Sequence, residues 1–163
     1  MSALPQNISL RHIVPEILDG LAADDPRAIH SRRDLIHVNA LMFNGPIMAG
    51  LLRKHVRAMP RRILEIGAGD GKFMLAVARR LAKNWPAVEL TLLDRVDLVS
   101  AATRDSFRKL GWRVETVTDD VFGWMQSAGE QRFDAITANL LLHHFDSADL
   151  ARLFSGLPDE RVQ

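Results

Sequence analysis

Hydrophobic positions divide the chain into two regimes that meet near Pro60. In residues 9–58 apolar side chains recur three or four positions apart, which is typical of helices. One such run ends at the Asp24-Asp25-Pro26 break and a second ends near Met42. The sequence Asn44-Gly45-Pro46 then predicts a turn before a third helix that runs to Val56.

After Pro60 short apolar runs with β-branched residues alternate with longer amphipathic stretches. The predicted strands are residues 62–66, 88–93, 113–117 and 133–138, and the predicted helices are residues 73–83, 97–110, a short one ending by Gly129, and about 147–154. Strands that alternate with helices indicate right-handed parallel βαβ units. The pattern therefore predicts an α/β fold, a doubly wound parallel sheet, preceded by a helical cap.

Composition limits the function classes. The 163 residues, 47% of them hydrophobic, suffice for one domain with a core. A formal charge of +1 does not indicate binding to nucleic acid or to an acidic membrane. The short clusters of basic residues are expected to lie on ordinary surfaces that face water. The absence of cysteine excludes disulfides and thiolate chemistry, and no apolar run has the length of a membrane span. We expect a soluble, cytoplasmic protein.

The stretch EIGAGDG, from Glu65 to Gly71, has a glycine at every second position directly after the first predicted strand. In a doubly wound sheet ligands bind beyond the carboxyl ends of the strands. Glycines at this point let a ligand approach the backbone, although a single glycine could serve the turn alone. The spacing is not the G-x-G-x-x-G of dinucleotide sites. Glu65 and Asp70 would repel a pyrophosphate but suit hydroxyls, an ammonium or a sulfonium centre.

Acidic residues also follow the second and third predicted strands. Asp94 ends the second strand, where it could accept hydrogen bonds from a ribose diol or only form a turn. Asp119 and Asp120 follow the third strand, where a carboxylate could accept from an exocyclic amine. Asp120 could instead only cap the short helix that starts at Val121.

Together these features resemble the motifs of class I S-adenosylmethionine-dependent methyltransferases of the bacterial small-molecule type. The resemblance runs from about Arg61 to Phe145 and includes FDAITANLLLHHF at the fourth strand. It implies a Rossmann-like sheet of strand order 3-2-1-4 and S-adenosylmethionine as the cofactor. The resemblance also implies a set of cofactor-binding residues, which begins in the glycine loop. These residues are Glu65, Gly67, Ala68, Gly69, Gly71, Asp94, Arg95, Asp119, Asp120, Val121, Asn139 and Leu140.

Within this resemblance the glycine loop holds the methionine and ribose portion of the cofactor. Asp94 would bind the ribose hydroxyls, Asp120 with Val121 the adenine, and Asn139 with Leu140 the methionyl side. Alignment of the reacting groups would supply much of the catalysis, because the cofactor already carries a good leaving group.

Two adjacent histidines are the candidate catalytic residues. His143 or His144 could take the proton of a hydroxyl acceptor as it is methylated. The alternative is a structural pair, with one ring bonded to the backbone and the other at the surface. No metal-ligand spacing is apparent among the six histidines.

The resemblance assigns residues 1–59 to a helical cap and residues 60–163 to the cofactor-binding domain. Family members have seven strands, whereas four are predicted here, so the C-terminal strands are expected to be missing. The chain would then be a fragment, or a second copy would cover the bare edge of the fourth strand in a homodimer.

The predicted activity is methylation of a small-molecule hydroxyl or carbon, with no nucleic acid and no membrane as partner. Asn139-Leu140-Leu141 after the fourth strand is not the motif expected for nucleobase amines. The alternatives are a catalytically inactive binding or dimerisation module and a nicotinamide-dependent oxidoreductase. The glycine spacing and Glu65 oppose the oxidoreductase. Trp85, Trp112 and Trp124 are expected to pack between sheet and helices.

Overall fold

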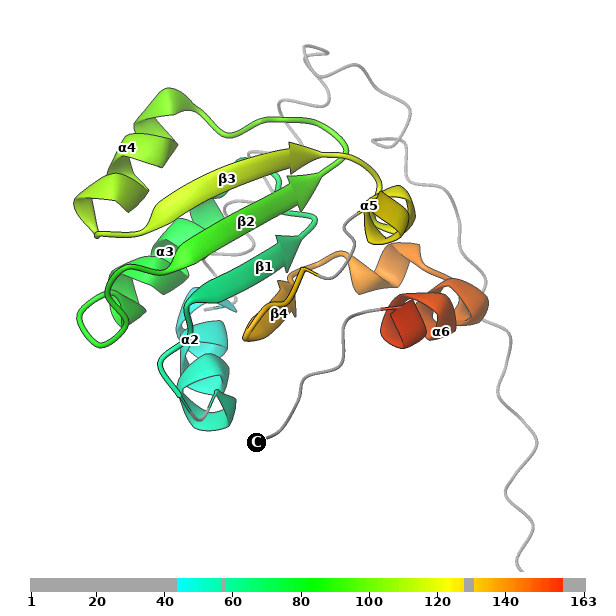
Figure 1. Cartoon of the computed structure of the whole chain (residues 1–163), viewed down its shortest axis with the longest axis horizontal. Helices are drawn as coiled ribbons and strands as arrows, with labels where there is room; N and C mark the ends of the chain where they lie inside the picture. Colours follow the sequence, from blue (N-terminus) through cyan, green and yellow to red (C-terminus); the bar gives the residue numbers. More distant parts are fainter. Residues whose placement is uncertain (1–43, 57, 128–130, 157–163) are drawn as a thin grey trace, which may run out of the picture.

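A parallel sheet forms the centre of the molecule. The computed structural model describes residues 44–56, 58–127 and 131–156, and Figure 1 shows the sheet between two groups of helices. Its order is β3-β2-β1-β4, and every neighbouring pair is parallel. The strands are β1 (Arg62–Ile66), β2 (Glu89–Asp94), β3 (Arg113–Thr118) and β4 (Ala135–Ala138). The predicted strand order is confirmed.

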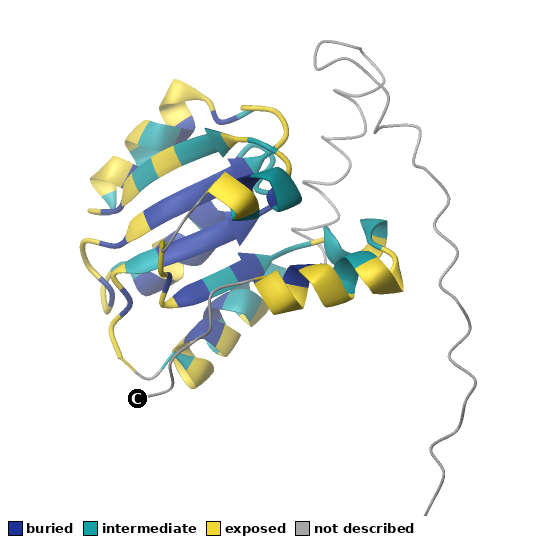
Figure 2. Cartoon of the chain, turned by 45° about the vertical axis from the view of Figure 1, so that its right-hand side comes forward, coloured by how far each residue is buried: buried dark blue, intermediate teal, exposed yellow. Residues whose placement is uncertain are grey.

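Burial along the strands follows their place in the sheet. The inner strand β1 is buried from Ile63 to Ile66, and β2 is buried from Leu90 to Leu93. Strands covered on both faces are continuously apolar, which explains the short apolar runs in the sequence. β3 lies at one edge and is only partly buried. Figure 2 shows the central strands in dark blue and the outer surfaces of the helices in yellow.

Helices cover both faces of the sheet, as predicted for a doubly wound fold. One face packs against α2 (Asn44–His55), α3 (Lys72–Leu81) and α4 (Ala101–Lys109), with a shared core that includes Leu52, Val77 and Phe107. The other face packs against α5 (Val121–Ser127) and α6 (Ser147–Gly156), which contribute Trp124 and Leu153 to a second core.

Two predicted element boundaries were wrong. Asn44-Gly45-Pro46 is the first turn of α2 and not a separate turn; proline fits there because the first amides of a helix need no partner within the helix. The helix predicted from Asp97 begins at Ala101, where the Ser100 hydroxyl caps it by accepting from the Thr103 N–H at 3.1 Å. The helices predicted before residue 44 lie outside the described residues.

The three tryptophans are buried, so their predicted role in core packing is confirmed. Trp112 is 2% exposed, and its indole N–H donates to the Trp85 carbonyl at 2.9 Å. This bond satisfies the one polar atom of a large buried ring, as expected for a tryptophan inside a protein.

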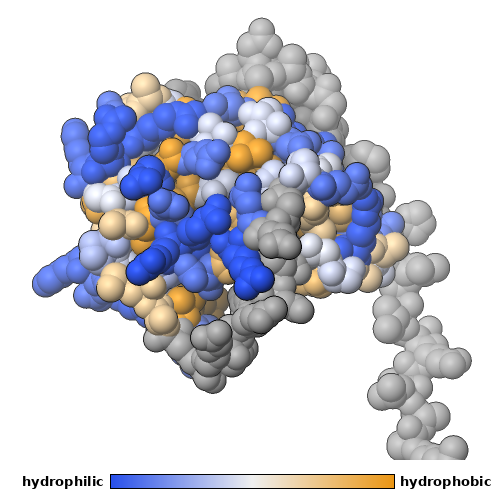
Figure 3. Space-filling view, in the orientation of Figure 1, coloured by the Kyte–Doolittle hydropathy of each residue, from blue (hydrophilic) through white to orange (hydrophobic). Residues whose placement is uncertain are grey.

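Charged residues on the surface are interspersed rather than collected in one field. Figure 3 shows hydrophilic blue areas broken by white and orange ones on the face that it presents. Arg113 pairs with Glu89 at 2.9 Å across β2 and β3, and Arg108 pairs with Asp105 at 2.6 Å along α4. Exposed pairs of this kind contribute little to stability but keep a surface mixed in sign.

Candidate functional site

The predicted glycine loop joins the carboxyl end of β1 to the start of α3. Gly67, Gly69 and Gly71 all have left-handed backbones, with φ of 73°, 54° and 74°. A Cβ added to Gly69 would meet no atom within 4 Å, so the backbone there faces open space. This position has the property that a ligand-binding glycine needs.

The other two glycines make room for protein and not for open space. A Cβ on Gly67 would lie 3.1 Å from the Leu141 side chain, and one on Gly71 would lie 3.2 Å from Leu92. At Gly67 and Gly71 the missing side chain therefore leaves room for protein atoms, and the contact of their backbone with a ligand stays a prediction. Their lack of a side chain is required by the segment after β4 and by the packing of β2.

Asp94 points its carboxylate back toward the glycine loop. One oxygen accepts from the Gly69 N–H at 2.8 Å and the other from the Val96 N–H at 3.3 Å. The loop is also anchored by its backbone, because the Gly67 and Ala68 amides donate to the Leu93 carbonyl. Asp94 is thus a turn former and a neighbour of Gly69 at once, so the two alternatives seen in the sequence do not exclude each other.

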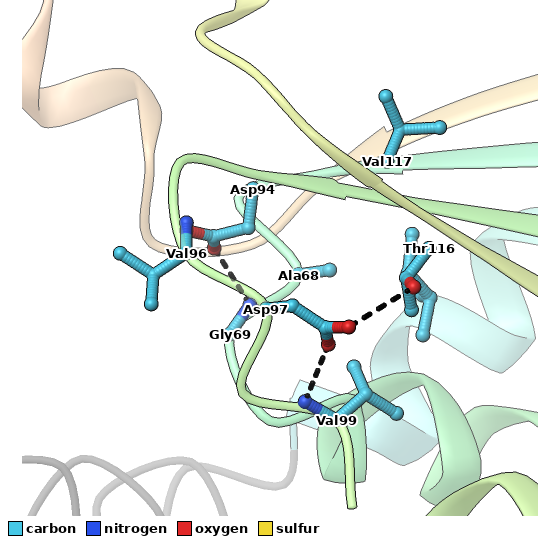
Figure 4. A pocket seen from close by; sticks show the side chains of 9 residues that line it. Ala68, Gly69, Asp94, Val96, Asp97, Val99, Thr116 and Val117 are labelled. Carbon is cyan, nitrogen blue, oxygen red and sulfur yellow. Dashed lines mark hydrogen bonds between the residues drawn. The ribbon is translucent and has the colours of Figure 1, made fainter. Parts of the chain in front are cut away.

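A small crevice lies beside this loop (Figure 4). Two carboxylates, Asp94 and Asp97, and the hydroxyl of Thr116 face it among apolar side chains. Its lining residues are Ala68, Gly69, Leu92, Asp94, Val96, Asp97, Val99, Thr116 and Val117. No lysine or arginine belongs to this lining, so the crevice favours hydroxyls or a cation over a phosphate.

Sequence reasoning missed Asp97, which it placed at the start of a helix. Its carboxylate accepts from the Val99 N–H at 3.1 Å and from the Arg104 guanidinium at 2.8 Å, and the Thr116 hydroxyl donates to it at 3.3 Å. These bonds hold the segment after Asp94 against α4 and β3. The available signal was the second acid in Asp94-Arg95-Val96-Asp97, three residues after the first.

Asp70 does not act as the free negative charge that the sequence suggested. The Lys72 ammonium lies 2.6 Å from one of its oxygens, and the Lys72 N–H donates to the other at 3.0 Å. Asp97 is likewise paired with Arg104, so the electrostatic argument against a pyrophosphate depends on Asp94 in the crevice.

Glu65 is buried below the loop and does not face the crevice. Its exposure is 1%, and the Thr137 hydroxyl on the neighbouring strand donates to its carboxyl group. Burial raises the pKa of Glu65 to about 8, although the bonds from Thr137 and the Asn139 backbone act to lower that pKa. The Glu65 carboxyl group thus lies behind the glycine loop in this structure, and its contact with the cofactor stays a prediction.

The acids after β3 occupy the start of α5. One oxygen of Asp120 accepts from the Phe122 and Gly123 amides at 2.9 and 3.0 Å, so Asp120 caps this helix. The Asp119 amide donates to the Asp94 carbonyl at 3.0 Å, and Val121 is buried. The cap is thus observed, and the contact of Asp120 and Val121 with adenine stays a prediction.

The segment after β4 lies at the same end of the sheet. Asn139 is partly buried, and Leu140 is 36% exposed with a left-handed backbone at φ 53°. Such a backbone is strained for leucine and is found more often near functional sites. His143 and His144 follow in a short 3₁₀ helix, η2 (Leu142–His144), with ring centroids 4.0 Å apart.

Neither a metal cluster nor a membrane span is evident in the described ranges. No group of three or more potential ligand side chains is close enough there to hold a metal ion. None of the helices in those ranges has both the length and the apolar character needed to cross a bilayer.

These observations define a class of protein, a doubly wound α/β domain with an acidic crevice and open glycine backbone at the carboxyl ends of its strands. The methyltransferase domain family matches residues 63–158. That range is more than half of the chain, and the chain belongs to this family. The match confirms the class I methyltransferase family predicted from the sequence, and the cofactor that the family implies is S-adenosylmethionine.

Two solved structures are similar to this chain, and in each the similarity covers less than half of the other protein. An O-methyltransferase family protein from Burkholderia thailandensis has a TM-score of 0.56 and 22% identity, with 82% of this chain and 38% of that one covered. The plantazolicin methyltransferase BpumL in complex with SAH has a TM-score of 0.53 and 20% identity, with 83% of this chain and 48% of that one covered. Both structures share the fold.

A curated relative contains the similar segment within a much longer protein. The probable non-canonical nonribosomal peptide synthetase CymA from Salinispora arenicola (strain CNS-205) is 27% identical over 153 residues, which are 87% of this chain and 2% of that protein. The chain thus spans less than half the length of each of these three relatives.

Proposed function

We propose that this chain carries the cofactor-binding part of an S-adenosylmethionine-dependent methyltransferase that methylates a small-molecule hydroxyl or carbon in the cytoplasm. One observation carries the proposal, namely the open backbone at Gly69 next to the Asp94 carboxylate. A carboxylate has about four acceptor sites, so Asp94 can keep its two backbone bonds and still accept from a ribose diol.

The chemistry of the crevice fits the cofactor that the family implies. The Asp94 carboxylate favours a cationic, hydroxyl-bearing nucleoside, and Ala68 and Val96 offer apolar surface to a ring. Asn139 and Leu140 would hold the methionyl side, and Arg95 and Asp119 would flank the nucleoside. When bound, the cofactor supplies a methyl group on a positively charged sulfur. The contribution of the chain is to bind, orient and exclude water.

His143 and His144 are proposed as the groups that accept a proton from a hydroxyl acceptor. They follow β4 at the carboxyl end of the sheet, and His144 is partly buried while His143 is exposed. The name of the Burkholderia thailandensis relative supports an oxygen acceptor. The other two relatives, named for plantazolicin and for a nonribosomal peptide synthetase, support action on a specialised metabolite.

A second candidate is a binding or dimerisation module without turnover. It is favoured by β4, which lies at an edge of the sheet with no further strand beside it in the described ranges. In that case a second copy of the chain would cover the edge.

Calorimetric titration with S-adenosylhomocysteine tests the proposal. We expect a micromolar dissociation constant for S-adenosylhomocysteine and no binding of NADH under the same conditions. Tight binding of NADH alone would overturn the proposal in favour of an oxidoreductase. Methyl transfer to a panel of phenols and carboxylic acids then separates the enzyme from the module, because the module would bind the cofactor product without turnover.

Gly69, which faces open space, and Gly71, which faces the Leu92 side chain, provide a matched pair of variants. Gly71→Ala is expected to lower the free energy of unfolding by roughly 1–3 kcal/mol, because it adds backbone strain and a contact with Leu92. Its folded fraction should bind S-adenosylhomocysteine normally. Gly69→Ala is expected to add the strain alone and to weaken binding, because the new methyl group would occupy the open space. Urea denaturation and titration measure the two effects, and equal binding by both variants would contradict this assignment.

A further inference from the structure

Glu65 and Thr137 form a buried pair at the junction of β1 and β4. They are partners in the register of the two strands, with exposures of 1% and 5%. The Thr137 hydroxyl donates to the Glu65 carboxyl group and lies 3.2 Å from the Leu64 carbonyl. The Asn139 backbone also bonds to this carboxyl group. Glu65 is therefore held by a neutral hydroxyl and a backbone group.

This pair lies between the two segments that the proposed function places around the cofactor. Glu65 lies two residues before Gly67 of the glycine loop, and Thr137 lies two residues before the segment from Asn139 to Leu141. The two segments also touch, because Leu141 lies against Gly67. The left-handed backbone of Leu140 between these contacts needs support from its surroundings.

We propose that Thr137 is a positioning residue of the cofactor site. Its hydroxyl fixes the Glu65 carboxyl group, which holds the Asn139 backbone and so keeps residues 139–141 against the glycine loop. The proposal rests on the proposed function, since it assigns Thr137 to the methyl-donor side of that site. Thr137 itself is buried and does not touch the cofactor.

Thr137→Val removes the hydroxyl and keeps the shape of the side chain, and Thr137→Ser restores the hydroxyl. We expect Thr137→Val to weaken S-adenosylhomocysteine binding by about tenfold, because a buried acceptor loses its donor. Thr137→Ser should bind within roughly twofold of the native chain, which is within ordinary variation for a conservative change. Thr91→Val is the matched control, because Thr91 on β2 is also buried, at 6% exposure, but does not line the crevice.

Hydrogen exchange provides a second readout that does not depend on the ligand. The amides of residues 139–141 should exchange faster in Thr137→Val than in the native chain, and at the native rate in Thr137→Ser and Thr91→Val. A merely structural role would lower the melting temperature but leave the affinity of the folded protein and this local exchange unchanged. If Thr137→Val does not fold, Thr137→Ala removes the same hydroxyl without a new methyl contact.

The outcomes separate the two proposals. Failure of the native chain to bind S-adenosylhomocysteine would overturn the proposed function, and the exchange experiment would still decide whether Thr137 holds the segment. Native affinity and native exchange in Thr137→Val would overturn the positioning role. Equal losses in Thr137→Val and Thr137→Ser would also overturn it, because the hydroxyl would then not be the group that matters.

Discussion

Asp94→Ala is expected to weaken S-adenosylhomocysteine binding by at least about tenfold, or about 1.4 kcal/mol. The truncation would remove the proposed acceptor for the ribose hydroxyls. It would also remove the acceptor for the Gly69 N–H at 2.8 Å and the Val96 N–H at 3.3 Å. Leaving such groups without partners loosens the loop that the ligand needs in place. Calorimetric titration of the variant and the native chain measures the loss.

Asp105→Ala is the matched control for this experiment. Asp105 is an exposed acid on α4 whose ion pair with Arg108 lies at the surface, so its removal should leave the affinity unchanged. Asp94→Asn keeps one acceptor oxygen for the Gly69 N–H and should fall between Asp94→Ala and the native chain. An affinity for Asp94→Ala equal to that of Asp105→Ala would refute the ribose contact.

The sheet could be predicted from the sequence because its determinants are local. Short buried runs such as Arg62–Ile66, each followed by a helical stretch, require parallel crossovers, and the family motifs give the strand order. Gly67, Gly69 and Gly71 were found for a similar reason, since their spacing after a strand is a local signal. The sequence placed the start of α4 too early, at Asp97, because this residue has helical spacing. In the structure its carboxylate instead accepts hydrogen bonds from Arg104 and Thr116.

The details of the site depend on contacts between distant residues, which no local pattern encodes. The need for glycine at position 71 comes from Leu92 on β2, and at position 67 from Leu141 beyond β4. The direction of Glu65 follows from strand alternation, which places it on the same face of β1 as Ile63 and toward α3. An acidic residue next to a glycine loop suggests a ligand contact, and only the paired strand shows that Thr137 is its partner.

The buried carboxyl group of Glu65 is expected to make stability fall as the pH rises. Burial raises the pKa of Glu65 from 4.5 to about 8 in the folded chain, so between these values the folded state keeps a proton that the unfolded state has lost. The stabilisation is complete below the lower value and is lost as the pH rises to the upper one. Within this window one such group changes the free energy of unfolding by about 1.4 kcal/mol per pH unit.

Glu65→Gln isolates this contribution, because glutamine resembles the protonated acid and can still accept from the Thr137 hydroxyl. The free energy of unfolding of the variant, relative to the native chain, should rise by about 1.4 kcal/mol per pH unit from about pH 5 to about pH 8. Urea denaturation of both chains at several pH values gives this difference, in which the remaining titrating groups cancel. Glu115→Gln on β3 is the control for the removal of one exposed acid from the chain. A flat difference for Glu65→Gln would mean that the buried acid is ionised throughout, and that the glycine loop lies above a carboxylate rather than a neutral carboxyl group.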